Sequence, residues 1–471
     1  MQYVADFHLH SKYSRAVSKD MILPNMALFG RKKGIDILTV ADWTHPLWFR
    51  EMSEQLEETN EGLYKLKSQS ANLKTTTQNS NLGNDLLFIL STEVSSIYSQ
   101  GGKVRRIHNL LFAPNFETAE KINKELQRRG CNLMADGRPI IGISAKDLLE
   151  LVLGIDRRVV IVPCHIWTPW FSLYGSNSGF DTIEECFGNY AKHIYGIETG
   201  LSSDPEMNWR IPELKTRTIL SFSDSHSLAK MAREATILEL VKPTYMNVMR
   251  ALIHPSILKN TVKPGEEEKL RNKIAYSIEF YPEEGKYHYN GHRNCNIVQS
   301  PQETKEKGNM CPVCKRSMTI GVMQRVEELA REELTVHSSS FTVDEFGVRW
   351  IKDPTGNQPP FVRLIPLIEI VAESLETSVA SIKVKAQFDQ LCEVFGNELT
   401  VILKTPLENI QSAFGQRLAD GIARVRKGTI SVDPGYDGEY GKVKIWNGKE
   451  ESPLVNTEVA EQAKGDQLDL F

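Results

Sequence analysis

The first half of the chain repeats one pattern, in which a short apolar run is followed by a polar residue and then by a segment with helical spacing. Helical spacing is clearest at residues 115–129 and 181–193. Strands that alternate with helices predict βα units around a parallel sheet, with the polar residues at the carboxyl ends of the strands. We therefore expect an α/β fold that begins with a barrel. The apolar runs lie at residues 3–7, 35–40, 86–90, 107–112, 159–162, 194–197 and 219–222.

This pattern stops near residue 245, and later segments have a different character. "LIPLIEIVAESL" and "FGQRLADGIARVRKG" have apolar residues at helical spacing, whereas "SVDPGYDGEYGKVKIW" indicates turns around a short strand. Within the first part, residues 53–84 are polar and predict a surface insertion, helical at first and then mobile. We expect four parts: the barrel at residues 1–245, a linker with a small cysteine-containing module at 246–330, a mixed α/β region at 331–447 and a flexible tail at 448–471.

Bulk composition limits the class of protein without identifying a partner. The net charge of −4 gives no overall basic field, so contact with nucleic acid would need a local basic face. No apolar run approaches the ~20 residues of a membrane span, and the N-terminus lacks the features of a signal peptide. We therefore expect a cytoplasmic protein with no membrane partner. The cysteine count of 7 is odd, which favours metal binding in a reducing compartment over a disulfide framework.

Residues of metal-binding type follow most of the apolar runs. In "ADFHLHSKYSRA" His8 and His10 are two positions apart, so both side chains would lie on one face of a strand. "DSH" repeats this geometry with Asp224 and His226. Each residue alone could be an ordinary polar core residue, but the whole set predicts a metal-dependent phosphoesterase site, in which a carboxylate bridges two ions about 4 Å apart. The other candidates are Asp42, His45, Glu93, His108 and His165.

A second cluster of ligands lies in the middle of the chain. Two knuckles of the form H-x-x-C and C-x-x-C have the spacing of a tetrahedral Cys3His site, which predicts one structural zinc ion. Such a site leaves no ligand position open, so this ion should not be catalytic. The four ligands are His292, Cys295, Cys311 and Cys314.

Several cations near these two clusters are candidates for binding phosphate or DNA. Arginine and lysine beside a metal site can hold the phosphate of a substrate. An ordinary solvated surface is the alternative interpretation for each of them. The candidates are Lys12, Arg15, Arg293, Lys315 and Arg316.

The chain ends in the apolar segment "QLDLF", which follows a polar tail. Leu468, Leu470 and Phe471 would be the apolar anchors of an extended peptide, with Gln467 fixing its register. Docking back onto the core of the same chain is the alternative. The segment resembles the binding motif for the bacterial sliding clamp in every defined position, and this resemblance implies the clamp as a partner.

The first 240 residues resemble the PHP family, the polymerase and histidinol phosphatase domain. The resemblance rests on "HLH" after the first strand, on the later His and Glu candidates and on "DSH". It implies a distorted (β/α)7 barrel that holds two or three divalent ions: zinc, manganese or magnesium. Many members carry an Asp soon after the first motif, where this chain has "SKYSR", so Asp42 is the substitute. The implied ligand sets are His8, His10, Glu93 and Asp224, which are also the catalytic residues, then Glu93, His108 and His165, and then His45 with His226.

The order of segments along the chain resembles the endonuclease Q family. "DWTHPLW", "PPFVRLIPLIEIVAESL" and "PGYDGEYGK" carry this likeness. It implies DNA repair by cleavage on the 5′ side of a deaminated base (uracil, hypoxanthine or xanthine) or of an abasic site, with residues 331–447 recognising the lesion and the protein associated with the nucleoid. Two alternatives stay open: a phosphoesterase for small phosphate esters, and a non-catalytic clamp-associated DNA-binding factor.

Overall fold

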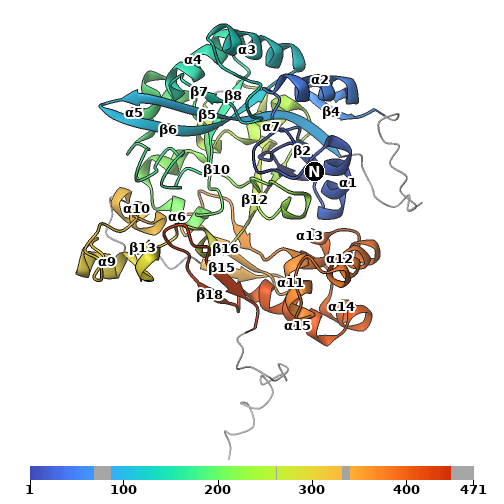
Figure 1. Cartoon of the computed structure of the whole chain (residues 1–471). Helices are drawn as coiled ribbons and strands as arrows, with labels where there is room; N and C mark the ends of the chain where they lie inside the picture. The colour runs from blue at the N-terminus through green and yellow to red at the C-terminus, as the bar shows by residue number, and fades with distance from the viewer. Residues whose placement is uncertain (68–85, 261, 331–339, 447–471) are drawn as a thin grey trace, which may run out of the picture.

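The computed structural model describes residues 1–67, 86–260, 262–330 and 340–446 (Figure 1). The segment "QLDLF" and most of the predicted insertion lie outside the described residues. The described residues form a mixed α/β structure with one large sheet, so the predicted α/β class is confirmed. Among them, none of the helices has the length and hydropathy that a membrane span requires.

The large sheet has 13 strands and extends from the first half of the chain into the second. Strands β6 (Lys103–Ala113), β7 (Ile140–Ile141) and β8 (Val160–Pro163) branch from its main path. β9 (Gly196–Glu198) and β10 (Thr218–Leu220) form a separate parallel pair. The main path runs through β15 (Ser340–Val343), β16 (Arg349–Lys352), β17 (Phe361–Arg363), β12 (Lys273–Glu279), β11 (Ala235–Glu239), β1 (Gln2–Asp6), β2 (Ile37–Thr39), β5 (Leu87–Gln100), β4 (Leu63–Leu66) and β3 (Leu56–Asn60).

The expectation of a parallel sheet is only partly met, because β5 and β6 form a long antiparallel hairpin. Their pairing runs from Gln100 opposite Lys103 to Leu90 opposite Ala113. The connecting residues Gly101 and Gly102 both have positive φ, the conformation that a two-residue hairpin turn requires. Strands β1, β2 and β5 are parallel to one another, as the alternating pattern predicts.

The helices differ in how closely they follow the sequence pattern. α3 (Phe116–Arg128) confirms the prediction for residues 115–129, and the Asn115 side chain caps its first turn by accepting from Thr118 N. By contrast, residues 183–193 form a short α-helix followed by a 3₁₀ turn. The other helices are α1 (Leu23–Lys33), α2 (Pro46–Gln55), α4 (Ala145–Ile155), α5 (Ile183–Phe187), α6 (Pro205–Trp209), α7 (Tyr245–Ala251), α8 (Pro255–Leu258), α9 (Pro301–Lys307), α10 (Val322–Leu329), α11 (Leu367–Ser374), α12 (Ile382–Phe395), α13 (Glu398–Leu403), α14 (Leu407–Phe414) and α15 (Gln416–Lys427).

Two short hairpins appear where the sequence predicts something simpler. In the region of the predicted insertion, α2 is followed by the β3–β4 hairpin instead of a longer helix. Near the end of the described chain, β18 (Ser431–Asp433) pairs with β19 (Lys442–Lys444), where one strand is predicted. A third hairpin, β13 (Asn290–His292) with β14 (Ile297–Gln299), lies in the cysteine-containing module beside α9 and α10 (Figure 1).

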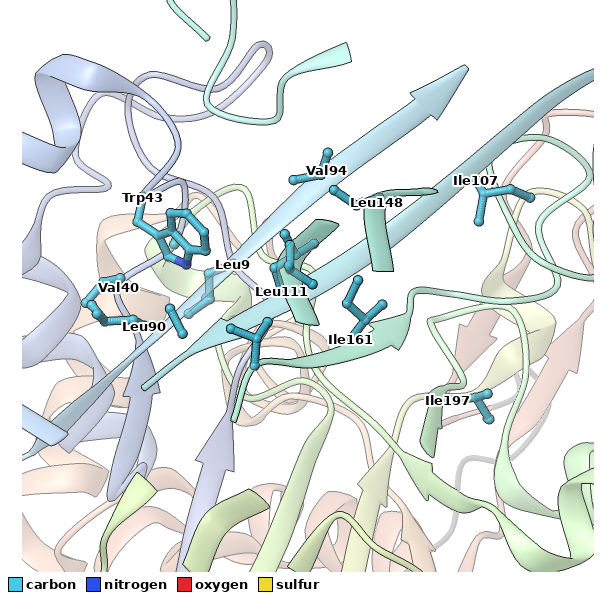
Figure 2. Close-up of a cluster of buried hydrophobic side chains, with 14 of the residues drawn as sticks. Leu9, Val40, Trp43, Leu90, Val94, Ile107, Leu111, Leu148, Ile161 and Ile197 are labelled. Carbon is cyan, nitrogen blue, oxygen red and sulfur yellow. The ribbon is translucent and has the colours of Figure 1, made fainter. Parts of the chain in front are cut away.

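A buried apolar cluster lies between the strands and the helices of the first half (Figure 2). Its side chains come from loops and strand ends (Leu9 and Trp43), from strands (Leu111 and Ile161) and from α4 (Leu148), and all of them are buried. Burial of such side chains contributes roughly 1.5–3 kcal/mol each. The cluster fixes the strands whose ends carry the polar candidates.

Candidate metal centre

The two short motifs "HLH" and "DSH" lie side by side at one end of the sheet. His10 N donates to Ser225 O at 3.1 Å, and Leu9 pairs with Ser225 in a parallel bridge. Strand β1 leads directly into the first motif, and the second follows β10. The same-face geometry of each motif therefore turns four potential ligands toward a common point.

Glu93 occupies the middle of this group. Its Oε2 lies 3.2 Å from His10 Nε2 and 3.5 Å from His8 Nε2. Its Oε1 contacts His108 Nδ1 and lies 3.1 Å from His165 Nε2. The hairpin positions His108, because β6 places it opposite Ser95, two residues beyond Glu93. One fully buried carboxylate thus faces four imidazoles, which is the arrangement of a bridging ligand.

Asp224 closes the group on the other side. Its Oδ1 lies 3.2 Å from His10 Nε2, 3.6 Å from His8 Nε2 and 3.8 Å from His226 Nδ1. Ligand atoms within 4.8 Å of one another form three neighbouring sets around Glu93 and His10. The sets are His8, His10 and Glu93; His10, Asp224 and His226; and Glu93, His108 and His165.

The unpaired atoms of this group fit divalent cations. His8 Nε2, His10 Nε2 and Asp224 Oδ1 are buried and make no hydrogen bond, although buried polar atoms normally have a partner. Burial lowers the pKa of His108 to about 4, which keeps its imidazole in the neutral, metal-binding form. Imidazole and carboxylate donors together suit zinc or manganese.

Two carboxylates lie behind the histidines and orient them. His8 Nδ1 lies 2.8 Å from Glu198 Oε1, and His10 Nδ1 lies 3.1 Å from Asp42 Oδ1. Each contact turns the Nε2 of that histidine toward Glu93 and Asp224. Asp42 Oδ2 also accepts hydrogen bonds from Ser11 N and Ser11 Oγ at 2.6 and 2.7 Å. Asp42, which the sequence suggests as a ligand, is therefore placed behind His10.

His45 lies apart from the three ligand sets. Its ring stacks on Tyr13, with 4.4 Å between the centroids, and its Nδ1 is buried without a hydrogen bond. Within the described part of the chain it belongs to no group of three close ligands, whereas His226 does. The third set therefore joins His226 to His10 and Asp224 rather than to His45.

The predicted zinc ligands converge in the small module. His292, Cys295, Cys311 and Cys314 have ligand atoms within 4.8 Å of one another. Cys314 Sγ lies 3.5 Å from His292 Nδ1. The first knuckle lies at the turn between β13 and β14, and the second lies in a turn closed by Cys311 N donating to Arg316 O at 2.8 Å. The candidate cations of this module, Arg293, Lys315 and Arg316, are all exposed.

Curated relatives extend over different parts of this chain. The model of the MJ0043 C-terminal domain family matches residues 366–429. The protein MJ0043 of Methanocaldococcus jannaschii is 29% identical over 286 residues, and the match covers 59% of this chain but only 31% of that protein. YqxK of Bacillus subtilis is 25% identical over 455 residues, 93% of this chain and 98% of that protein.

Two solved structures match nearly the whole chain. The lesion-specific endonuclease PfuEndoQ from Pyrococcus furiosus has a TM-score of 0.74 at 26% identity, covering 94% of this chain and 95% of that one. Endonuclease Q in complex with a 27-mer duplex substrate with an abasic lesion at the active site has a TM-score of 0.76 at 26% identity, covering 98% and 100%. This chain is an endonuclease Q-like protein. The predicted likeness to endonuclease Q is confirmed, and so is the prediction that the protein is an enzyme.

In this endonuclease Q-like protein, Arg138 is a site residue that the sequence did not reveal. Its Nη1 lies 3.1 Å from Glu93 Oε2, and the Glu93 charge raises the pKa of Arg138 above its ordinary value. The sequence-based candidates are less well placed: Lys12 pairs with Glu51 at 2.9 Å, and the side chain of Arg15 is 85% exposed. Arg138 stands in "ADGRP", between apolar runs, so no periodic signal marked it.

Proposed function

We propose that this endonuclease Q-like protein is a metal-dependent DNA endonuclease that cuts on the 5′ side of deaminated bases or abasic sites. One observation carries the proposal: the buried Glu93 carboxylate lies among four histidines, next to unpaired nitrogen and oxygen atoms. The likeness to an endonuclease Q solved with an abasic duplex supports DNA as the substrate. Action on DNA would place the protein in the cytoplasm with the nucleoid.

The proposed centre is of the PHP barrel type and holds two or three divalent ions of zinc, manganese or magnesium. His8, His10, Glu93 and Asp224 are the central ligands; His108 and His165 share Glu93 for a second position, and His226 joins a third. When bound, such ions neutralise phosphate charge and make the attacking water more acidic. Glu198 and Asp42 hold the imidazoles of His8 and His10 in place. Glu93 is buried away from bulk water, which strengthens its interactions with charged groups.

The reaction is a hydrolysis that conserves all atoms of one water molecule. The water oxygen forms a bond to the phosphorus on the 5′ side of the lesion nucleotide, and the bond from this phosphorus to the 3′ oxygen of the preceding nucleotide breaks. One proton of the water ends on that 3′ oxygen. The products are a 3′-hydroxyl and a 5′-phosphate.

We further propose that the module at residues 290–329 holds one structural zinc ion and contributes to DNA binding. The convergence of His292 and the three cysteines supports this ion. The exposed cations Arg293, Lys315 and Arg316 are suited to phosphate contacts. Residues 331–447 would then complete the contact with the damaged strand.

The clamp interaction is a separate proposal, because "QLDLF" lies outside the described residues. We expect a protein that ends before Gln467 to lose binding to the bacterial sliding clamp and to cleave short oligonucleotides at the normal rate. Titration of the clamp with full-length and shortened protein tests this. Equal clamp affinity of both forms would contradict the proposal.

The decisive experiment measures cleavage of duplexes that carry one uracil, hypoxanthine or abasic site. An undamaged duplex and a small aryl phosphate are tested separately as comparison substrates. We expect nicking of the damaged strand with manganese, zinc or magnesium, and product ends that a ligase and a kinase identify as 3′-hydroxyl and 5′-phosphate. Equal turnover of the aryl phosphate would favour a small-ester phosphoesterase. No cleavage with any of these metals would favour a non-catalytic DNA-binding factor.

A further inference from the structure

Arg138 is held beside Glu93 by the backbone of the sheet. Strand β7 pairs with β5 in parallel, with Ser95 opposite Ile140, and Ser95 N donates to Pro139 O at 3.0 Å. Continuing this register backward by two residues brings Arg138 level with Glu93. Arg138 therefore lies at the end of the loop that leads into β7, and the strand pairing that begins two residues later fixes this end of the loop.

The residues before Arg138 also fix its approach. A Cβ atom at Gly137 would collide with the Asp42 carboxylate and the Ser14 hydroxyl, so only glycine allows the loop to pass this close to the support of His10. Gly137 N donates to Tyr13 O at 3.1 Å. The Asp136 carboxylate accepts from Arg138 N at 3.1 Å and thereby closes the turn.

The environment of the guanidinium is suited to an anion that arrives from solvent. The Arg138 side chain is 25% exposed, whereas that of Glu93 is fully buried, so the arginine forms the outer rim of the centre. Glu93 is also the carboxylate that would bridge the ions, because it belongs to two of the three ligand sets. When divalent cations share the charge of Glu93, the ion pair between Glu93 and Arg138 becomes weaker. Arg138 keeps its positive charge, and its five N–H donors can then bind an anion.

We propose that Arg138 is a catalytic residue that binds a non-bridging oxygen of the scissile phosphate when the ions are bound. This inference rests on the proposed function and adds one substrate contact to it. A guanidinium matches the geometry of two phosphate oxygens and keeps its charge at every working pH. It stabilises the negative charge on the non-bridging oxygens while the bond from phosphorus to the water oxygen forms and the bond to the 3′ oxygen breaks.

The test measures binding of inorganic phosphate to the manganese-loaded protein by calorimetry, beside cleavage of an abasic duplex. We expect Arg138→Met to weaken phosphate binding about 10- to 100-fold and to lower kcat about 10²- to 10³-fold. Arg138→Lys should recover part of both losses. Arg128→Met, which removes an exposed arginine paired with Glu125 on α3, is the matched control and should change neither.

Two outcomes separate this inference from its alternatives. If Arg138→Met binds phosphate as tightly as the wild type at saturating manganese, while its manganese affinity differs, then Arg138 is only a counter-ion of Glu93 and the proposal is wrong. If the wild type cleaves no damaged duplex but phosphate binding still depends on Arg138, the contact is supported and the DNA function fails. Restoration of Arg138→Ala cleavage by added guanidinium would support the contact independently of any change in folding.

Discussion

The two ligand clusters of this protein are built in opposite ways. The metal centre collects its residues from strand ends between His8 and His226, whereas the small module collects its four ligands between His292 and Cys314. In the first cluster the sheet fixes the distances. In the second, two tight turns do so. The distributed cluster depends on the whole fold, and the local cluster depends on its own short loops.

The surroundings of the two clusters also differ. His8 and His10 are fully buried and have carboxylates behind them, and Arg138 lies at the exposed rim. Cys311 is buried, but Cys314 is exposed and its neighbours are backbone turns and solvated cations. A centre with oriented ligands and an accessible side is suited to catalysis, whereas four ligands that enclose one ion are suited to folding a small module.

The largest expected effect is that of His10→Ala, because His10 belongs to two of the three ligand sets. We expect a loss of cleavage of more than ~100-fold, since changes to residues behind the ligands already cost roughly 10- to 100-fold. The change should lower activity much more strongly than stability, because the His10 side chain faces Glu93 and Asp224 instead of apolar core side chains. Cleavage kinetics and thermal melting check this, and cleavage near the wild-type rate would contradict the centre.

A smaller effect is expected for Glu198→Gln, which keeps the size of the side chain but weakens the support of His8. We expect metal affinity or cleavage to fall about 10- to 100-fold. Metal titration followed by cleavage at saturating metal distinguishes the two. Glu206→Gln on α6 is the control, because that carboxylate pairs with Arg363 instead of a histidine. An unchanged Glu198→Gln protein would show that the sheet alone orients His8.

The sequence predicts the local cluster more completely than the distributed one. The spacing of two knuckles identifies all four residues of the module, because neighbours along the chain remain neighbours in space. For the metal centre, strand-end positions identify most of the converging residues. They do not distinguish Asp42, which supports His10, from Asp224, which faces the unpaired nitrogens. Whether a carboxylate supports a histidine or binds an ion depends on the path of its loop in the folded protein, which the sequence pattern does not give.

The sequence predicted the fold where apolar residues recur at clear helical spacing. It did not predict the fold where the conformation of a turn determines how two strands pair. The apolar spacing of residues 115–129 and of "FGQRLADGIARVRKG" corresponds to α3 and α15. The antiparallel pairing of β5 with β6 depends on the turn at Gly101 and Gly102, which lies in the mostly polar stretch "SSIYSQGGKVRR". Arg138 was missed for a related reason: the two-residue strand β7, which carries it to Glu93, is too short to have a period.

An intermediate effect is expected for the double change Cys311→Ser and Cys314→Ser. A structural zinc ion contributes folding free energy to its module, so the module should lose order and the protein about one zinc ion per chain. Cleavage should fall less than for His10→Ala, because the centre keeps its own ligands. Metal analysis, proteolysis at residues 290–329 and cleavage kinetics check this. An unchanged zinc content would show that Cys311 and Cys314 do not bind a zinc ion.

The smallest expected effect concerns one of the contacts between the first half of the chain and the module. Trp170 lies five residues after His165, and its ring meets Tyr287 edge-on, with 5.7 Å between the centroids. Tyr287 in turn accepts from Val322 N at 2.7 Å, at the start of α10 in the module. An aromatic pair of this kind contributes about 0.5–1.5 kcal/mol beyond its burial. This pair is therefore a weak part of the contact between the segment after His165 and the module, which also includes Arg325 donating to Tyr174 O and pairing with Asp181.

We expect Trp170→Ala to lower the free energy of unfolding by about 1 kcal/mol through this pair and to reduce cleavage by less than tenfold, with Trp170→Phe close to wild type. A double-mutant cycle with Tyr287→Ala isolates the pair, because the second change should cost little once the first ring is absent. If Trp170→Ala instead lost cleavage as strongly as His10→Ala at unchanged stability, Trp170 would contact the substrate. The two clusters would then act as one site, and their separation into a reacting centre and a folding module would be wrong.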